Sequence, residues 1–132
     1  MSGDRIRAGL VVFAAYQLAI GLFQVVAPGT FFEEVGPFGV QNDHYIRDNA
    51  SWELALGLAL VVAVRVPSWR VPVLALAVAH FALHSVNHFV DIGEAEPGWL
   101  GVADAVSLSI GTLLLWALLA GARRRDAAGR GA

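Results

Sequence analysis

The chain has 132 residues, of which 57% are hydrophobic and 15% charged, and its formal net charge is −2. This apolar share is too high for an ordinary soluble domain of this length and predicts a single domain in a lipid bilayer. The absence of cysteine excludes disulfides, thiolate metal sites and thiol nucleophiles. The negative net charge, without a basic face, argues against nucleic-acid binding.

Four stretches contain about 20 predominantly apolar residues each, which is enough to cross a hydrocarbon core of about 30 Å. The sequence therefore predicts an all-α integral membrane protein, a bundle of four transmembrane helices within residues 1–122. Residues 123–132 form a short arginine-rich tail. The predicted spans are 6–27, 48–66, 71–90 and 99–120.

The first predicted span carries Gln17 and Gln24, which are seven residues apart and therefore lie on one helical stripe. A cleaved signal peptide is the alternative for this segment, because Arg5 and Arg7 precede the apolar run. The length of the run and Pro28 after it favour a membrane span.

The loop after this span contains Phe31, Phe32 and Phe38, which we expect at the outer membrane interface as a short amphipathic piece or lid. A plain connector is the alternative. His44 follows in a polar run directly before the second span. We expect it at the mouth of a pocket, with a solvated loop as the other possibility.

Two acids lie inside the predicted spans: Glu53 in the second, and Asp104 five residues into the fourth, counted from Trp99. A carboxylate below the membrane interface either pairs with a cation or stays protonated. Both residues are therefore predicted as catalytic groups that move protons or face a positive charge.

The third span contains His80, His84 and His88, four residues apart, with Asn87 and Asp91 on the same stripe. Polar side chains are costly in hydrocarbon, so such a stripe indicates a site. A His-x-x-x-His pair with carboxylates from neighbouring helices suits zinc, iron, manganese or copper.

All nine cationic side chains are arginine, which with the wealth of Ala, Val, Leu and Gly hints at a bacterial genome rich in G and C. Eight of them precede the first span, flank the second loop or follow the fourth span: Arg5, Arg7, Arg65, Arg70, Arg123, Arg124, Arg125 and Arg130. The positive-inside rule then predicts a multi-pass protein of the bacterial plasma membrane with both termini in the cytoplasm.

This topology puts polar groups of all four spans in the outer half of the membrane and predicts an outward-facing pocket. His84 and His88 are its expected metal ligands, with His80 and Asp91 in support. The expected cofactor-binding residues are Gln24, His44 and Asn87, and the expected catalytic residues are Glu53 and Asp104.

The predicted pocket binds a divalent metal or a lipophilic small molecule such as a quinone, with redox or proton-transfer chemistry. One alternative is a non-enzymatic structural or accessory subunit whose polar groups only bind one another across helices. Another is a membrane isomerase or cyclase that protonates an isoprenoid with Glu53 or Asp104. The lipid bilayer is the expected partner, and a homo-oligomer is compatible with the sequence. Whether the chain is an enzyme stays open.

Four short motifs carry a resemblance: Pro28-Gly29 with Phe31-Phe32, His44 followed by Arg47-Asp48, Leu54-Ala55-Leu56-Gly57, and His84 with His88-Phe89-Val90-Asp91. Together they resemble uncharacterised actinobacterial four-span membrane proteins and, more loosely, DoxX-like membrane proteins. The resemblance covers about residues 9–120. It implies a four-span fold and an association with quinone-linked or redox functions, but it implies no catalytic residue.

Overall fold

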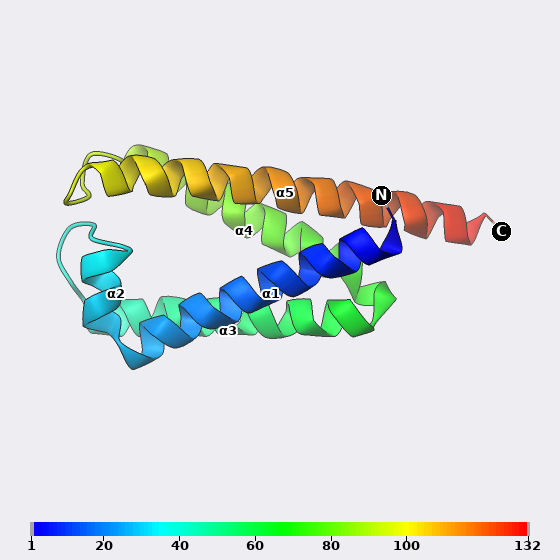
Figure 1. Ribbon diagram of the computed structural model, residues 1–132, viewed down its shortest axis with the longest axis horizontal. Coiled ribbons are helices and arrows are strands. Elements are labelled where there is room, and N and C mark those ends of the chain that lie inside the picture. Colours follow the sequence, from blue (N-terminus) through cyan, green and yellow to red (C-terminus); the bar gives the residue numbers. More distant parts are fainter. Residues whose placement is uncertain (1, 132) are drawn as a thin grey trace.

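The computed structural model describes residues 2–131, and its regular elements are helices (Figure 1). In chain order they are α1 (Gly3–Val26), α2 (Pro28–Glu34), α3 (Asp43–Arg65), the short 3-10 helix η1 (Pro67–Trp69), α4 (Arg70–Val90) and α5 (Trp99–Arg130). No β-strand occurs among the described residues, and Phe38 and Ala95 form only an isolated bridge between two loops. The prediction of an all-α protein is confirmed.

Local sequence signals set the ends of α3. The side-chain oxygen of Asn42 accepts hydrogen bonds from the backbone N–H groups of His44 at 3.1 Å and Tyr45 at 3.2 Å, as an N-cap residue does. The helix therefore begins at Asp43, and His44 lies in its first turn rather than in a solvated loop. At the other end Pro67 follows an extended residue and separates α3 from α4.

The long helices pack as two pairs, α1 along α3 and α4 along α5, and these pairs make the most extensive contacts. Glycines let the first pair approach closely. A Cβ added at Gly21 of α1 would lie 2.9 Å from Leu54, and one at Gly57 of α3 would lie 2.8 Å from Leu18. Small residues permit such close helix contact in membranes. Polar side chains of α1 and α3 are thereby brought within hydrogen-bonding distance.

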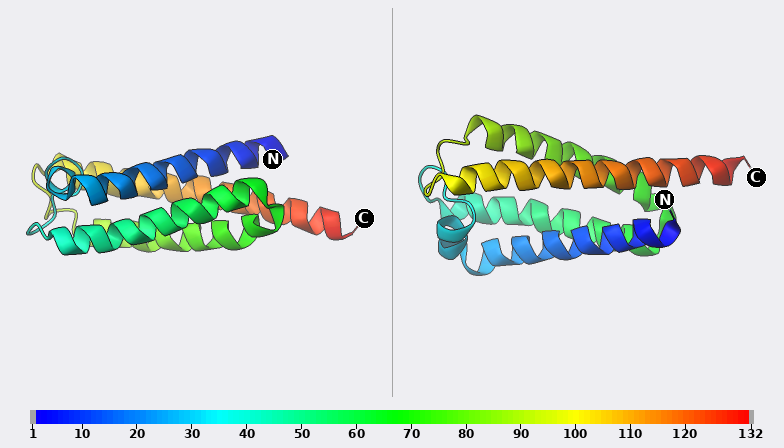
Figure 2. Two further views of the ribbon diagram at one scale, coloured as in Figure 1. Left: turned by 90° about the horizontal axis from the view of Figure 1, so that it is seen from below. Right: turned by 45° about the horizontal axis from the view of Figure 1, so that its top comes forward.

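Both termini and η1 lie at one end of the molecule, here called the terminal end, whereas α2 and the loop between α4 and α5 lie at the opposite loop end (Figures 1 and 2). The terminal half holds an apolar core whose largest fully buried side chains include Ile6, Leu10, Leu60, Leu74 and Leu115. At the loop end the two helix pairs diverge (Figure 1). The cavity described below lies between the two pairs at this end.

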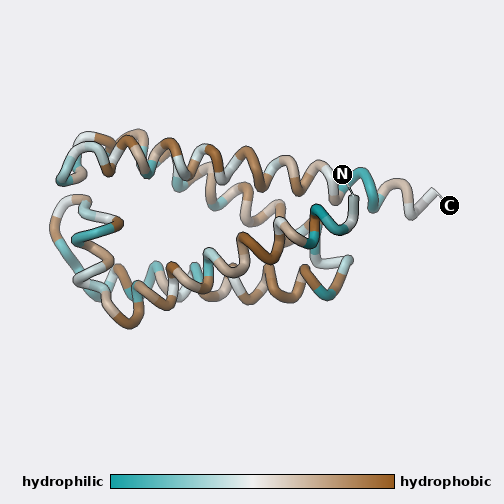
Figure 3. Tube along the Cα trace, in the orientation of Figure 1, coloured by the Kyte–Doolittle hydropathy of each residue, from teal (hydrophilic) through white to brown (hydrophobic). Residues whose placement is uncertain are grey.

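Arginine gathers at the terminal end, because it occupies the start of α1, the turn between α3 and α4 and the last turns of α5. The predicted tail at 123–132 is not a separate segment through most of its length, since α5 continues to Arg130. Figure 3 shows hydrophilic positions at this end and long hydrophobic stretches between the two ends.

Three segments are long and apolar enough to cross a membrane: Gly3–Val26, Pro67–Val90 and Trp99–Gly129. They correspond to the predicted spans 6–27, 71–90 and 99–120. Large apolar side chains such as Val12, Leu83 and Leu113 point outward from them. The remaining predicted span, 48–66, falls in α3 except for its last residue. The loop-end half of α3 is more polar, and α3 is not one of these three segments. The crossing of the membrane by α3 stays a prediction.

Candidate metal-binding cavity

A cavity of about 220 Å³ lies between the two helix pairs in the loop-end half of the molecule. Its lining comes from α1 to α5 and from the loop between α2 and α3. Most polar groups of the predicted spans meet there. The amide, carboxyl, imidazole and hydroxyl side chains that line it are Gln17, Gln24, Asn49, Glu53, His80, His84, His88, Asp104, Tyr16 and Ser107.

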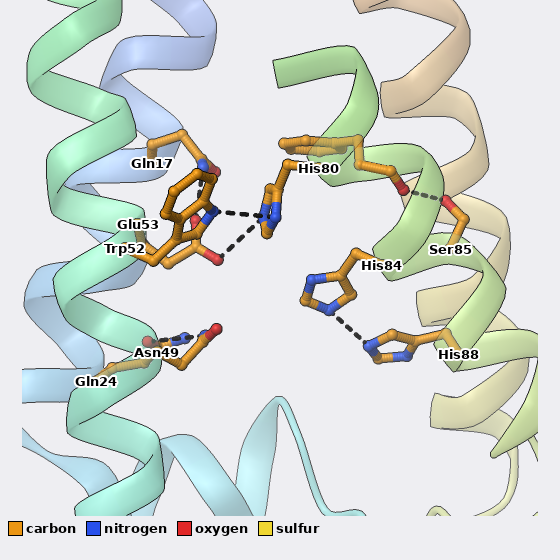
Figure 4. Close-up of polar contacts among 10 residues, drawn as sticks. Gln17, Gln24, Asn49, Trp52, Glu53, His80, His84, Ser85 and His88 are labelled. Carbon is orange, nitrogen blue, oxygen red and sulfur yellow. Dashed lines mark hydrogen bonds and ion pairs between the residues drawn. The ribbon is translucent and has the colours of Figure 1, made fainter. Parts of the chain in front are cut away.

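Glu53 of α3 is the most enclosed ionisable group of the cavity, with only 5% of the residue exposed. Gln17 of α1 donates a hydrogen bond from Nε2 to Glu53 Oε2 at 2.5 Å. On its other side, Glu53 Oε1 lies 3.6 Å from Nε2 of His80 on α4 (Figure 4). A buried carboxylate requires such partners because its desolvation is costly. Glu53 therefore links three helices.

His80 has a second partner on α3. The indole Nε1 of Trp52 donates to His80 Nδ1 at 3.0 Å, and the two rings lie 5.4 Å apart between centroids. Trp52 and Glu53 thus engage opposite nitrogens of one imidazole (Figure 4). An imidazole held at both nitrogens has a fixed ring orientation.

His84 and His88 form a stacked pair nearer the loop end of α4. Their Nε2 atoms are 2.9 Å apart, with the ring planes 17° apart and the centroids separated by 4.8 Å. His88 Nδ1 lies 4.0 Å from Asp104 Oδ2 on α5 and is buried without a hydrogen-bond partner among the described residues. Phe38, from the loop after α2, packs edge-on against His88. Glu53, His80, His84, His88 and Asp104 therefore follow one another across the cavity, and they are here called the polar row.

Glu53, His80 and His84 each offer one ligand atom, and these three atoms lie within 4.8 Å of one another. Two imidazoles and one carboxylate are a common donor set for zinc and iron. Ligand atoms around zinc, bound at about 2.0–2.1 Å, lie about 3.4 Å apart. The side chains would therefore close in by no more than about 1.5 Å to hold an ion.

No arginine lines the cavity in the part of the chain that the structure describes. Arg47, the one arginine predicted on this side, instead pairs with Asp43 at 3.8 Å on the surface of α3. Inside the cavity, histidine is therefore the cationic partner available to Glu53 and Asp104 from the described lining. A bound cation and protonation of the carboxylates are the other ways to balance their charge.

The structure brings together six of the predicted site residues, Gln24, Glu53, His80, His84, His88 and Asp104, all in the cavity lining. Gln24 accepts a hydrogen bond from Asn49 at 3.2 Å.

Three other predicted residues lie outside the cavity lining. The side chain of His44 is 78% exposed and pairs with Asp48 at 3.4 Å. Asp91 is exposed at the end of α4, and Asn87 lines a groove on the outer face between α3 and α4. These three residues are not part of the polar row.

Three residues that contact the site, Gln17, Trp52 and Phe38, were not predicted as site residues. The stripe shared by Gln17 and Gln24 was the available signal for Gln17, which is 1% exposed. Trp52 lies inside the predicted second span, and Phe38 was expected only in a lid or connector. Their contacts with His80 and His88 cross between distant segments, and spacing within one helix carries no signal for such contacts.

Comparison of the chain with protein-family models, with curated proteins and with solved structures finds no match. The resemblance to DoxX-like proteins therefore stays a prediction. The chemistry of the cavity is the basis for a functional proposal.

Proposed function

We propose that this protein is a four-span membrane protein that binds one divalent metal ion through Glu53, His80 and His84. The observation that carries the proposal is the convergence of one ligand atom from each residue to within 4.8 Å. A carboxylate and two neutral imidazoles leave one positive charge on a bound divalent ion. Asp104, which lines the same cavity, would balance that charge.

Zinc and iron(II) are the ions that this donor set fits best. Three protein ligands leave at least one coordination position open, which is typical of sites that bind water or a substrate. The open position would face the cavity. The volume of the cavity, about 220 Å³, is below the range of about 300–1,000 Å³ usual for sites of drug-sized ligands. The site therefore suits a small polar ligand better than a whole quinone or isoprenoid.

His88 and Asp104 would orient the metal-bound His84. Because Nε2 of His84 contacts His88, Nδ1 is the nitrogen left for the ion. His84 Nε2–H would then donate to His88 Nε2, and His88 would carry its proton on Nδ1, toward Asp104. Metal-bound histidines usually donate their second N–H in this manner, and the acceptors tune the metal. The same row can pass a proton between the ion and Asp104.

The distribution of arginine supports the proposed placement in the membrane. With the arginine-rich terminal end in the cytoplasm of a bacterium, the loop end and the cavity face outward. We propose α3 as the fourth span because it packs along α1 over its length. Its outermost charged residues, Asp43, Arg47 and Asp48, would lie at the interface. Glu53 is the charged side chain of α3 enclosed by other helices.

Zinc titration of the full-length protein in lipid nanodiscs tests the proposal. We expect one zinc ion per chain by calorimetry. Glu53→Gln, His80→Ala and His84→Ala should each weaken binding at least tenfold. His44→Ala is the matched control, because it removes an exposed histidine outside the cavity and should leave binding unchanged. Absence of saturable binding, or equal losses in His44→Ala and His84→Ala, would contradict the proposal.

A second candidate is a structural subunit whose polar residues only join helices. The hydrogen bonds from Gln17 to Glu53 and from Asn49 to Gln24 favour it, since both connect α1 to α3. In that case the variants of Glu53 and His84 lower thermal stability and no metal binds. The zinc titration separates the two candidates.

A further inference from the structure

The geometry points to Trp52 as a residue that competes with a metal ion for the imidazole of His80, so that metal binding requires the indole to leave His80. This inference rests on the proposed metal binding and names a regulator of that site. Trp52 is not a ligand in it. The residue acts through the proton position and orientation of the His80 ring.

The indole N–H can only donate a hydrogen bond. His80 Nδ1 therefore accepts from Trp52 with its lone pair. A neutral imidazole carries one proton, which must then be on Nε2, the nitrogen 3.6 Å from Glu53. A metal ion needs a nitrogen lone pair. As long as Trp52 donates to Nδ1, neither nitrogen of neutral His80 has a free lone pair.

Either route to a metal-bound neutral His80 breaks the bond to Trp52. If the ion binds Nδ1, it takes the lone pair that Trp52 uses. If it binds Nε2, that nitrogen gives its proton to a water molecule, and Nδ1 takes a proton from water in return, so that no net proton is lost. The imidazole then stays neutral, but two N–H groups of Trp52 and His80 point at each other. The indole must turn away in both cases.

The structure has space for that turn. A groove of about 420 Å³ runs along the outer face between α3 and α4, next to Trp52. Leu76, Ala79 and Leu83 form part of its wall, and Trp52 is already 38% exposed. Asn49 and Asn87 also line the groove, and their amide oxygens are possible acceptors for the freed indole N–H. The rotation therefore leaves the buried core in place.

The groove and the cavity share His80 and His84. Departure of the indole from His80 would therefore expose the ligands on the side of the molecule, between α3 and α4. In a membrane this side faces lipid. Trp52 would thus control both the proton position on His80 and access from the bilayer.

Substitution by phenylalanine tests this role, since Trp52→Phe keeps an aromatic ring and removes the donor. We expect zinc to bind the variant about fivefold more tightly, which corresponds to the net value of one ordinary hydrogen bond, about 1 kcal/mol. Trp116→Phe is the matched control, because Trp116 is 58% exposed on α5 and outside both the cavity and the groove. It should bind zinc as the native chain does. Equal or weaker zinc binding by Trp52→Phe overturns the inference.

A spectroscopic measurement covers the case in which Trp52→Phe folds poorly. In a variant that replaces Trp69, Trp99 and Trp116 with phenylalanine, Trp52 is the sole tryptophan. Its emission should shift on zinc addition with the same midpoint as binding. Zinc binding without a change in emission overturns the role of Trp52 and leaves the metal site intact. A native chain that binds no zinc overturns both proposals.

Discussion

Replacing Gln17 with leucine removes the donor that holds one oxygen of Glu53. Gln17 and Glu53 are 1% and 5% exposed, and their bond is 2.5 Å long. Loss of a hydrogen bond to a charged group costs about 1.5–3 kcal/mol in soluble proteins. Hydrogen bonds between membrane helices contribute about 0.6 kcal/mol to stability on average, with a maximum of about 1.7 kcal/mol. Since Glu53 would stay buried with one oxygen unpaired, we expect Gln17→Leu to lower the free energy of unfolding by about 1.5 kcal/mol.

Reversible unfolding of the metal-free protein in mixed micelles, followed by circular dichroism, measures this loss. The double variant Gln17→Leu/Glu53→Leu removes both partners and should be more stable than Gln17→Leu alone, because no buried acceptor is left. Gln24→Leu is the control, since its partner Asn49 is exposed, and it should cost less than about 0.6 kcal/mol. An unchanged stability in Gln17→Leu, or a double variant less stable than the single one, refutes the reasoning.

Three further predictions concern the ion, its surroundings and the helix contact. Zinc affinity should fall at least about tenfold as the pH is lowered from 7.5 to 4, because the histidine ligands must be unprotonated to bind; calorimetry at both values checks this, and a flat profile counts against histidine ligands. His88→Ala should weaken zinc binding about 10–100-fold by removing the acceptor for His84, whereas an unchanged affinity would deny His88 that role. Gly57→Ala should destabilise the fold by about 1–3 kcal/mol, because its Cβ would lie 2.8 Å from Leu18. Gly93→Ala, where an added Cβ meets nothing within 4 Å, should be nearly neutral in the same unfolding assay.

The sequence was sufficient to predict the helical class because long apolar runs between proline and glycine allow little else in a membrane. It also predicted that His84 and His88 share a helical face, and they do lie stacked in one cavity lining. Because successive spans run in opposite directions, Glu53 and Asp104 were predicted at the same end of the bundle as the histidines. A shared helical face depends on residue spacing within one helix, and a shared end of the bundle depends on the order of the helices. Both can be determined from the sequence.

The pairing of individual side chains was not predictable in the same way. Helical period fixes which residues share a face, but the rotation of one helix relative to its neighbour depends on packing, here on contacts such as that of Gly57 with Leu18. That rotation brings Glu53 to His80 and Gln17, and Trp52 to His80. His80 was expected only in support because no partner for it could be identified from spacing.

X-ray absorption at the zinc edge of the loaded protein tests the metal site most directly. We expect a first shell of two imidazole nitrogens with oxygen at about 2.0–2.1 Å. We also expect that the double variant His80→Ala/His84→Ala loses the imidazole contribution and that His44→Ala keeps it. A shell of oxygen alone in the native protein, or an imidazole contribution that survives in the double variant, would contradict binding by Glu53, His80 and His84.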